Sequence, residues 1–425
     1  MWRVLGDASP YWRLLPPELR DTLPTPSLVV FMDDVRANVS RMISRAGGAA
    51  RWRPHLKTTK LRPVWAHLLR AGVRSFKCAT VREAALFLDV VAEERVHGVD
   101  LLCNHQSAPN ARRLAEATSA HASRALGTSV SLLVEAPETA AALPAGLGGW
   151  LDLNPSAGPD PSSPSGAFDR TGCPAADKAT AGATVRQLGE RFRGVHWCAR
   201  AAARQACWHA ETPATSAAGR NPSGIRPARS TASLRSSRVR SALARPRPPM
   251  PAHARLCPRR RYDGHNPPPS SYDGLLATLD ALPFGDSPFG RAEHVPLVTS
   301  GTPTFEGALD HAALGARHAA AVRARSTGTH QVSPGTVVFA DGRTLEQTCA
   351  SLGLRPAALV LTSVVSCPAP DVLTCDAGSK SLAAETGDPC ADAVGAPGLL
   401  ALRPFEEHLP IRWLPAGEGA RAAAR

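Results

Sequence analysis

The feature that most limits how this chain can fold is a repeated alternation of short β-rich runs with helical patterns. Eight strands with intervening helices is the number for a closed parallel barrel, so we expect the α/β class and a (β/α)8 barrel. The eight predicted strands cover residues 52–55, 75–79, 100–104, 129–135, 150–154, 194–197, 295–300 and 331–338. Predicted helices between them include residues 60–71, 81–91, 109–120 and 272–282.

The pattern changes on both sides of the predicted barrel. A strand at residues 27–32 precedes it, and after about residue 345 β-rich runs with turns follow, at residues 357–366, 372–376 and 399–403. We assign these runs to a second, C-terminal β-rich domain that the N-terminal strand completes. The predicted divisions are an N-terminal segment (1–33), the barrel (34–340) and the β-rich domain (341–425).

The net charge of +13 comes from one segment rather than from the whole chain. Residues 198–261 hold 14 arginines, no lysine and one acidic residue, Glu211, so the rest of the chain is neutral and gives no case for a nucleic-acid partner. The segment is rich in Ala, Arg, Pro and Ser, a composition that buries too little surface to offset its ordering entropy. We expect a disordered insert here, with a functional basic arm or an incorrect gene model as alternatives. Residues 155–168 indicate a second, shorter insert.

Composition also bears on the compartment. No run approaches the roughly 20 apolar residues that a membrane span needs. Asp7 and Pro10 interrupt the N-terminus before any apolar signal-peptide core forms. The 10 cysteines include no Cys-x-x-Cys pair and do not suggest a disulfide framework in a chain of 425 residues. We expect reduced thiols in a cytoplasmic protein that does not bind a membrane.

A polar stretch, RPHLKTTK at residues 53–60, begins within the first predicted barrel strand. Lys57 is therefore expected at the C-terminal end of an early strand, the edge where barrel enzymes keep their chemistry; a solvated lysine is the plain alternative. The stretch resembles the Schiff-base lysine motif of the D-threonine aldolase and eukaryotic-type D-serine dehydratase family, pyridoxal-phosphate enzymes of fold type III with an alanine-racemase-like barrel. The resemblance covers roughly residues 20–197 and 262–412. It implies that Lys57 forms the internal aldimine and, once freed, acts as the base at the substrate Cα.

Two turns rich in hydroxyl groups and glycine follow the seventh and eighth predicted strands, at residues 299–304 and 333–336. Such turns present backbone N–H groups and hydroxyls to an anion, although either one alone can be an ordinary turn. On adjacent strands of one barrel rim they predict a phosphate cup. The resemblance assigns phosphate binding to Ser300, Gly301, Thr302, Gly335 and Thr336.

The resemblance adds further pocket residues. Arg170, in the sequence DRTG, is implied to face the phenolic oxygen of the cofactor, with a salt bridge to the preceding aspartate as the alternative. Tyr262 and His265, in the sequence YDGH, are implied to line the cofactor and substrate pocket after the sixth strand. His55 is a substrate-pocket candidate beside Lys57. His408, in the sequence EEH of the β-rich domain, is another candidate, or is structural.

The metal centre of the family has no counterpart in this sequence. In the family, a His-x-Cys or His-x-Asp pair beyond the EEH segment binds a divalent metal, Zn or Mn, near the substrate hydroxyl. Here the chain runs from His408 to Arg425 without either pair. We therefore expect pyridoxal phosphate as the cofactor, no metal ligands, and a truncated β-rich domain.

The resemblance implies a lyase that acts on small D-β-hydroxy amino acids and allows a homodimer. Dehydration of D-serine to pyruvate and ammonia, and retro-aldol cleavage of D-threonine to glycine and acetaldehyde, both stay open. Racemisation is less expected, because the second tyrosine base of such racemases comes from the β-rich domain, and none of the three tyrosines here lies in it. The alternative is a degenerate or incomplete family member that binds the cofactor without turnover.

Overall fold

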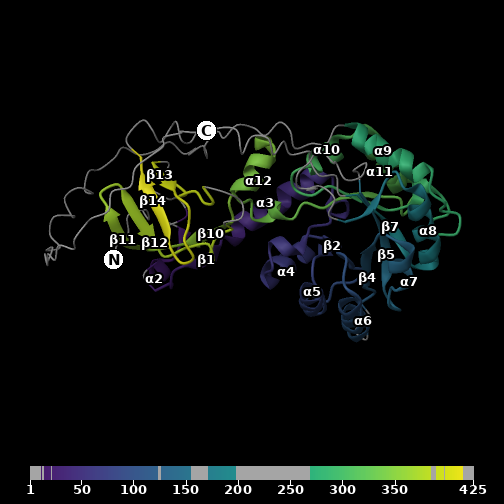
Figure 1. Ribbon diagram of the computed structural model, residues 1–425, viewed down its shortest axis with the longest axis horizontal. Helices are drawn as coiled ribbons and strands as arrows, with labels where there is room; N and C mark the ends of the chain where they lie inside the picture. The colour runs from purple at the N-terminus through teal and green to yellow at the C-terminus, as the bar shows by residue number, and fades with distance from the viewer. Residues whose placement is uncertain are drawn as a thin grey trace, which may run out of the picture. The chain divides into compact units, whose positions relative to one another are not determined.

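A computed structural model describes residues 11, 14–20, 22–122, 126–154, 171–197, 269–383, 389–396 and 398–414. Within these ranges the chain forms a parallel sheet flanked by helices, together with antiparallel strands from its C-terminal part (Figure 1). The two predicted inserts, at residues 155–168 and 198–261, lie outside the described residues.

Seven parallel strands pair side by side in the order β2-β3-β4-β5-β7-β8-β9. A short strand, β6 (Cys173–Pro174), extends the sheet beside the end of β5. The bounds of the seven are β2 (Ser75–Cys78), β3 (Asp100–Cys103), β4 (Ser129–Val134), β5 (Gly148–Asn154), β7 (Phe192–Trp197), β8 (Leu297–Thr299) and β9 (His330–Val332).

The segment at residues 52–55 closes this sheet into a ring. Trp52 bridges Val332 of β9 and His55 bridges Lys77 of β2, both in parallel. The Lys77 N–H also donates to the Pro54 carbonyl at 3.0 Å. Because the first segment touches both the last strand and the second, the predicted (β/α)8 barrel is confirmed.

Helices lie on the outside of the strands (Figure 1). Helix α5 (Val81–Glu93) shows why they form: the Thr80 hydroxyl caps it by accepting the Glu83 N–H at 3.2 Å, and Ala84, Phe87 and Val91 bury one face. The barrel helices are α4 (Arg62–Arg70), α5, α6 (Ala108–Ala122), α7 (Pro137–Ala141), α8 (Lys178–Leu188), α9 (Pro269–Asp280), α10 (Phe305–Asp310) and α11 (Ala312–Arg323). Helices α2 (Pro17–Arg20) and α3 (Met32–Ala46) precede the barrel, and α12 (Gly342–Gln347) follows it.

The inside of the barrel is filled in two layers of different chemistry. Leu102, Leu133, Trp150 and Val298 form a buried apolar cluster, with the Arg53 guanidinium 4.9 Å from the centre of the Trp150 ring. Side chains two residues apart on a strand face the same way. The next inward positions toward the carboxyl ends of three of these strands are therefore polar: Asn104, Glu135 and Asp152.

The C-terminal strands form two antiparallel sheets. Strand β10 (Ala358–Leu361) pairs with β1 (Ser27–Val30), so the predicted completion of the β-rich region by the N-terminal strand is confirmed. The other sheet has the order β11-β12-β14-β13. Its strands are β11 (Val364–Ala369), β12 (Val372–Cys375), β13 (Leu399–Ala401) and β14 (Leu409–Trp413).

Several predicted strands differ from the structure by one to three residues at their ends, and two differ by more. The predicted strand at residues 357–366 is divided between β10 and β11, because the Asp376 carboxylate accepts bonds from the Thr362 hydroxyl (2.7 Å) and the Ser363 N–H (3.0 Å) at the break. The strand at residues 331–338 is also shorter than predicted: β9 ends at Val332, and η7 (Thr336–Val338) is a 3-10 turn.

The predicted domain limits, near residues 33 and 340, stay predictions. Among the described helices, none has the length and apolar character to cross a membrane.

Candidate active site at the carboxyl ends of the barrel strands

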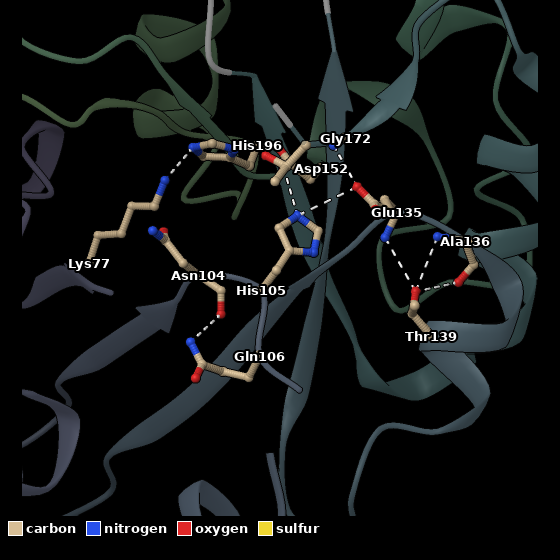
Figure 2. Close-up of polar contacts among 11 residues, drawn as sticks. Lys77, Asn104, His105, Gln106, Glu135, Ala136, Thr139, Asp152, Gly172 and His196 are labelled. Carbon is tan, nitrogen blue, oxygen red and sulfur yellow. Dashed lines mark hydrogen bonds and ion pairs between the residues drawn. The ribbon is translucent and has the colours of Figure 1, made fainter. Parts of the chain in front are cut away.

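A chain of buried polar side chains crosses the inside of the barrel near the carboxyl ends of its strands (Figure 2). Lys77 Nζ lies 2.7 Å from His196 Nε2, and His196 Nδ1 lies 2.6 Å from Asp152 Oδ1. All three side chains are buried. Strands β2 and β7 are not neighbours in the sheet, so Lys77 and His196 meet because both side chains point into the barrel.

The second oxygen of Asp152 continues the chain toward solvent. His105 Nε2 lies 2.8 Å from Asp152 Oδ2, and the Thr171 hydroxyl donates to the same oxygen at 3.1 Å. Glu135 Oε2 lies 3.9 Å from His105 Nε2 and accepts the Gly172 N–H at 2.6 Å (Figure 2). The chain therefore connects a buried lysine with a histidine whose side chain is 24% exposed.

The environment fixes the protonation of the two central groups. Burial alone would raise the pKa of Asp152, but its electrostatic interactions and hydrogen bonds with His196 and His105 hold it well below its usual range. Burial and the charge of Lys77 lower the pKa of His196, against the opposing effect of Asp152. Because the ionised carboxylate can only accept, the neutral His196 ring donates through Nδ1–H and presents Nε2 as an acceptor to Lys77.

His55 is also neutral. Its burial, followed by the charges of Lys77, Lys57 and His196, lowers its pKa well below the usual value of 6.5. Its Nδ1 accepts the Lys57 backbone N–H at 3.3 Å, which leaves the proton on Nε2. That buried Nε2 has no hydrogen-bond partner among the described residues. His55 therefore presents an unused N–H donor beside Lys57.

The loops that follow β8 and β9 are tied to each other. The Ser333 N–H donates to the carbonyls of Thr299 (3.1 Å) and Ser300 (2.9 Å), and the Thr336 hydroxyl donates to the Thr302 hydroxyl at 2.8 Å. Ser300 has a left-handed backbone, with φ of 57°. These contacts bring the hydroxyl-bearing residues of two adjacent strand ends together.

The Lys57 loop packs directly against the β9 loop. A Cβ added at Gly335 would lie 2.6 Å from the His55 carbonyl oxygen and 2.8 Å from the Thr58 hydroxyl. Only glycine allows this approach, which places η3 (Leu56–Thr58), the turn that carries Lys57, beside residues 333–336.

Comparison with known sequences points to one group of enzymes. A family model described as "Putative serine dehydratase domain" matches residues 357–423. The D-threo-3-hydroxyaspartate dehydratase of Delftia sp. (strain HT23) is 33% identical over 81 residues, which are 19% of this chain and 21% of that protein. The match thus spans about a fifth of the curated relative.

Solved structures share the fold over most of the chain. D-threonine aldolase from Filomicrobium marinum superposes with a TM-score of 0.57 at 16% identity, over 93% of this chain and 84% of that one. D-threo-3-hydroxyaspartate dehydratase from Delftia sp. HT23 superposes with a TM-score of 0.55 at 20% identity, over 94% and 85%. The resemblance to the D-threonine aldolase and D-serine dehydratase family is confirmed.

The structure brings part of the set implied by the family into one place. Lys57 and His55 lie in the loop that packs on Gly335, and the β8 and β9 loops hold the remaining phosphate candidates, Ser300, Gly301, Thr302 and Thr336. The side chain of Lys57 is exposed. Three candidates, Arg170, Tyr262 and His265, lie outside the described residues. His408 is exposed in the turn before β14, and its carbonyl accepts the Phe405 N–H at 2.8 Å.

The loops fit the phosphate group that cofactors of this family carry. Ser333 Oγ is buried without a hydrogen-bond partner among the described residues. Gly301 leaves open space, since the nearest atom to an added Cβ is a Pro303 carbon at 3.9 Å. An unused buried donor beside an open glycine turn suits an anion that contacts the backbone. Within the described ranges, no three His, Cys, Asp or Glu side chains gather so as to hold a metal ion.

The sequence did not reveal Lys77, His105, Asp152 and His196. Each lies in or directly after a predicted strand, where an ionisable residue alternating with apolar ones normally faces solvent. In a closed barrel, however, the residues that alternate with the helix-facing apolar ones point into the barrel interior. The available signal was Asp152 in the run WLDLN, because a carboxylate in a strand of a buried parallel sheet needs buried partners.

Replacing Gly335 by alanine should separate the Lys57 loop from the β9 loop. The added Cβ would meet the His55 backbone carbonyl, which cannot rotate away, so we expect a loss of about 1–3 kcal/mol in the free energy of unfolding. Urea unfolding followed by circular dichroism measures this loss. Gly301→Ala is the matched control, since its Cβ has room. Equal stability of the two variants would contradict the close packing.

Proposed function

We propose that the chain is a pyridoxal-phosphate-dependent lyase that acts on small D-β-hydroxy amino acids, with Lys57 as the lysine that binds the cofactor covalently. One observation carries this proposal: the Lys57 loop closes the barrel and packs against the loops of adjacent strands that are rich in hydroxyl and amide donors. An amine next to an anion-binding turn is the arrangement that a phosphorylated aldehyde requires.

The residues have separate tasks. Ser300, Gly301, Thr302, Gly335 and Thr336 would hold the phosphate, and Arg170 and Tyr262 would contact the ring. When bound, pyridoxal phosphate supplies an electron sink for the charge that develops at the substrate Cα. Lys57, released when the substrate amine replaces it, would take the Cα proton, and the unused Nε2–H of His55 offers a donor to a substrate or cofactor oxygen.

Three substrates should be compared. D-Serine would give pyruvate and ammonia by dehydration, and D-threonine would give glycine and acetaldehyde by retro-aldol cleavage. The curated relative is a D-threo-3-hydroxyaspartate dehydratase, so that amino acid is the third substrate. A homodimer and a cytoplasmic location are part of the same proposal.

The test uses the full chain incubated with pyridoxal phosphate. We expect an absorbance band that borohydride bleaches, with the reduced cofactor on the peptide that contains Lys57, and product from at least one substrate. Assays are run with and without Zn²⁺ or Mn²⁺. Label at Lys57 without product from any substrate would favour a cofactor-binding protein without turnover. Label on another lysine would refute the assignment of Lys57.

A further inference from the structure

Lys77, His196 and Asp152 have the geometry of an amine, a base and an orienting carboxylate (Figure 2). The amine nitrogen lies 2.7 Å from one ring nitrogen of His196, and the carboxylate lies 2.6 Å from the other. This order is the one in which a histidine activates a nucleophile or an acid–base group, because the carboxylate fixes the tautomer that leaves Nε2 free to accept. The family resemblance assigns no role to these three residues.

We propose that Lys77 is a second acid–base residue of the site, which exchanges a proton with the bound amino acid, and that His196 and Asp152 are its positioning residues. This rests on the proposed lyase function.

The charged surroundings of Lys77 come from several strands. His55, on the neighbouring segment 52–55, and Lys57 lie on one side, since the charges of Lys77 and Lys57 both act on the His55 ring. His196, on β7, contacts Lys77 through Nε2 and contacts Asp152, on β5, through Nδ1. His105 and Glu135 extend the same chain outward. The ionised Asp152 balances a cation that forms on either Lys77 or His196.

The proton transfer balances without any further reactant. His196 Nε2 accepts a proton from Lys77 Nζ, the Nζ–H bond breaks, and an Nε2–H bond forms. The imidazolium is stabilised by Asp152, and Lys77 is left with a lone pair. That lone pair would accept the proton of a substrate O–H or N–H group, whose electron pair stays on the substrate, while the Cα proton remains the task of Lys57. The reverse transfers restore the resting state, so no net charge is gained or lost.

Lys77→Arg separates an acid–base role from a structural one. Arginine keeps the positive charge and can donate to His196 Nε2, but it does not release its proton in proteins. We expect kcat to fall about 100- to 1000-fold while the borohydride label at Lys57 is retained. The kcat of Lys77→Met should fall by the same factor. Lys178→Arg, at an exposed position on α8, is the matched control with unchanged kcat. Full activity of Lys77→Arg would overturn the acid–base role.

The positioning residues are tested by the pH profile of kcat. Asp152 opposes the lowering of the pKa of His196, so Asp152→Asn should move the acidic limb of the profile to lower pH as well as reduce kcat. An acidic limb that stays in place would contradict a role for His196 in setting the protonation of Lys77.

A measurement on the protein without cofactor tests the triad apart from turnover. In the ¹⁵N spectrum of histidine-labelled protein, the His196 ring should show Nδ1 protonated and Nε2 unprotonated, with assignment from the signals missing in His196→Gln. Lys77→Met should shift the Nε2 signal, since it removes the donor. A protonated Nε2 would overturn the triad even in an active lyase. The expected tautomer in a protein that turns over no substrate would instead overturn the lyase function, and the role of Lys77 in catalysis with it.

Discussion

Lys57→Ala protein incubated with pyridoxal phosphate should show no borohydride-reducible band, and its turnover of D-β-hydroxy amino acids should fall by about three orders of magnitude or more. The substitution removes both the covalent attachment and the base at the substrate Cα, and losing such a group costs about 10²–10⁴-fold for proton transfer alone. The phosphate loops stay intact, so the cofactor should still bind reversibly. Absorbance spectra, mass spectrometry after reduction and product assays measure the three effects.

Lys60→Arg is the matched control, because Lys60 is exposed in the same loop and its ion pair with Glu83, at 3.5 Å, can be kept by arginine. It should retain the band and the activity. A band that persists in Lys57→Ala and maps to Lys77 would reverse the roles of the two lysines. The double variant Lys57→Ala/Lys77→Met would then lose it.

The stability of the protein without cofactor should fall steeply as the pH drops below about 6.5. Three buried histidines, His55, His196 and His330, have a lowered pKa, and burial is the largest cause for each. Above pH 6.5, the usual histidine pKa, they are neutral in both states; below it, the unfolded chain binds protons that the folded chain excludes. Each histidine removes about 1.4 kcal/mol per pH unit, so the slope approaches about 4 kcal/mol per pH unit.

Urea unfolding at several values between about pH 5 and pH 8 measures this slope. His330→Gln should reduce the slope by one proton, about 1.4 kcal/mol per pH unit, since His330 is fully buried beside Thr299. Gln187→Asn, at an exposed position, should leave the slope as in the wild type because neither side chain is titratable. A flat profile between pH 5 and pH 6.5 would show that the buried rings protonate within the fold.

The alternation of strands and helices was enough to predict the barrel, because burial between helices demands apolar strands at regular intervals. Strand ends were harder to place. The prediction ran β9 on to residue 338, although Ser333, Pro334 and Gly335 turn the chain away after Val332. It also missed β14, since Pro410 and Arg412 interrupt the apolar pattern of that strand. Pairing partners within the sheet, rather than local preference, decide both cases.

The site residues also differ in whether local sequence or contacts across the barrel determine their place. The proximity of the Lys57 loop to the β8 and β9 loops could be predicted because their short motifs carry the information locally, while their proposed roles stay predictions. Lys77, Asp152 and His196 could not, since each has an ordinary sequence context and gains its meaning only from the others across the barrel. A single sequence gives strand periodicity but does not say which alternate face becomes the interior.

The closure of the barrel by residues 52–55 affects the order in which the protein can mature. Segment 52–55, next to Lys57, leaves the ribosome well before its neighbour in the ring, β9 (His330–Val332), and before the Gly335 turn. Contacts this distant in sequence are slow to form and carry a high loop-closure cost. Lys57 and the loops that follow β8 and β9 therefore meet only when the ring is nearly complete. A ligand that contacts both Lys57 and these loops would stabilise only the closed barrel. It would bind nascent or truncated chains poorly.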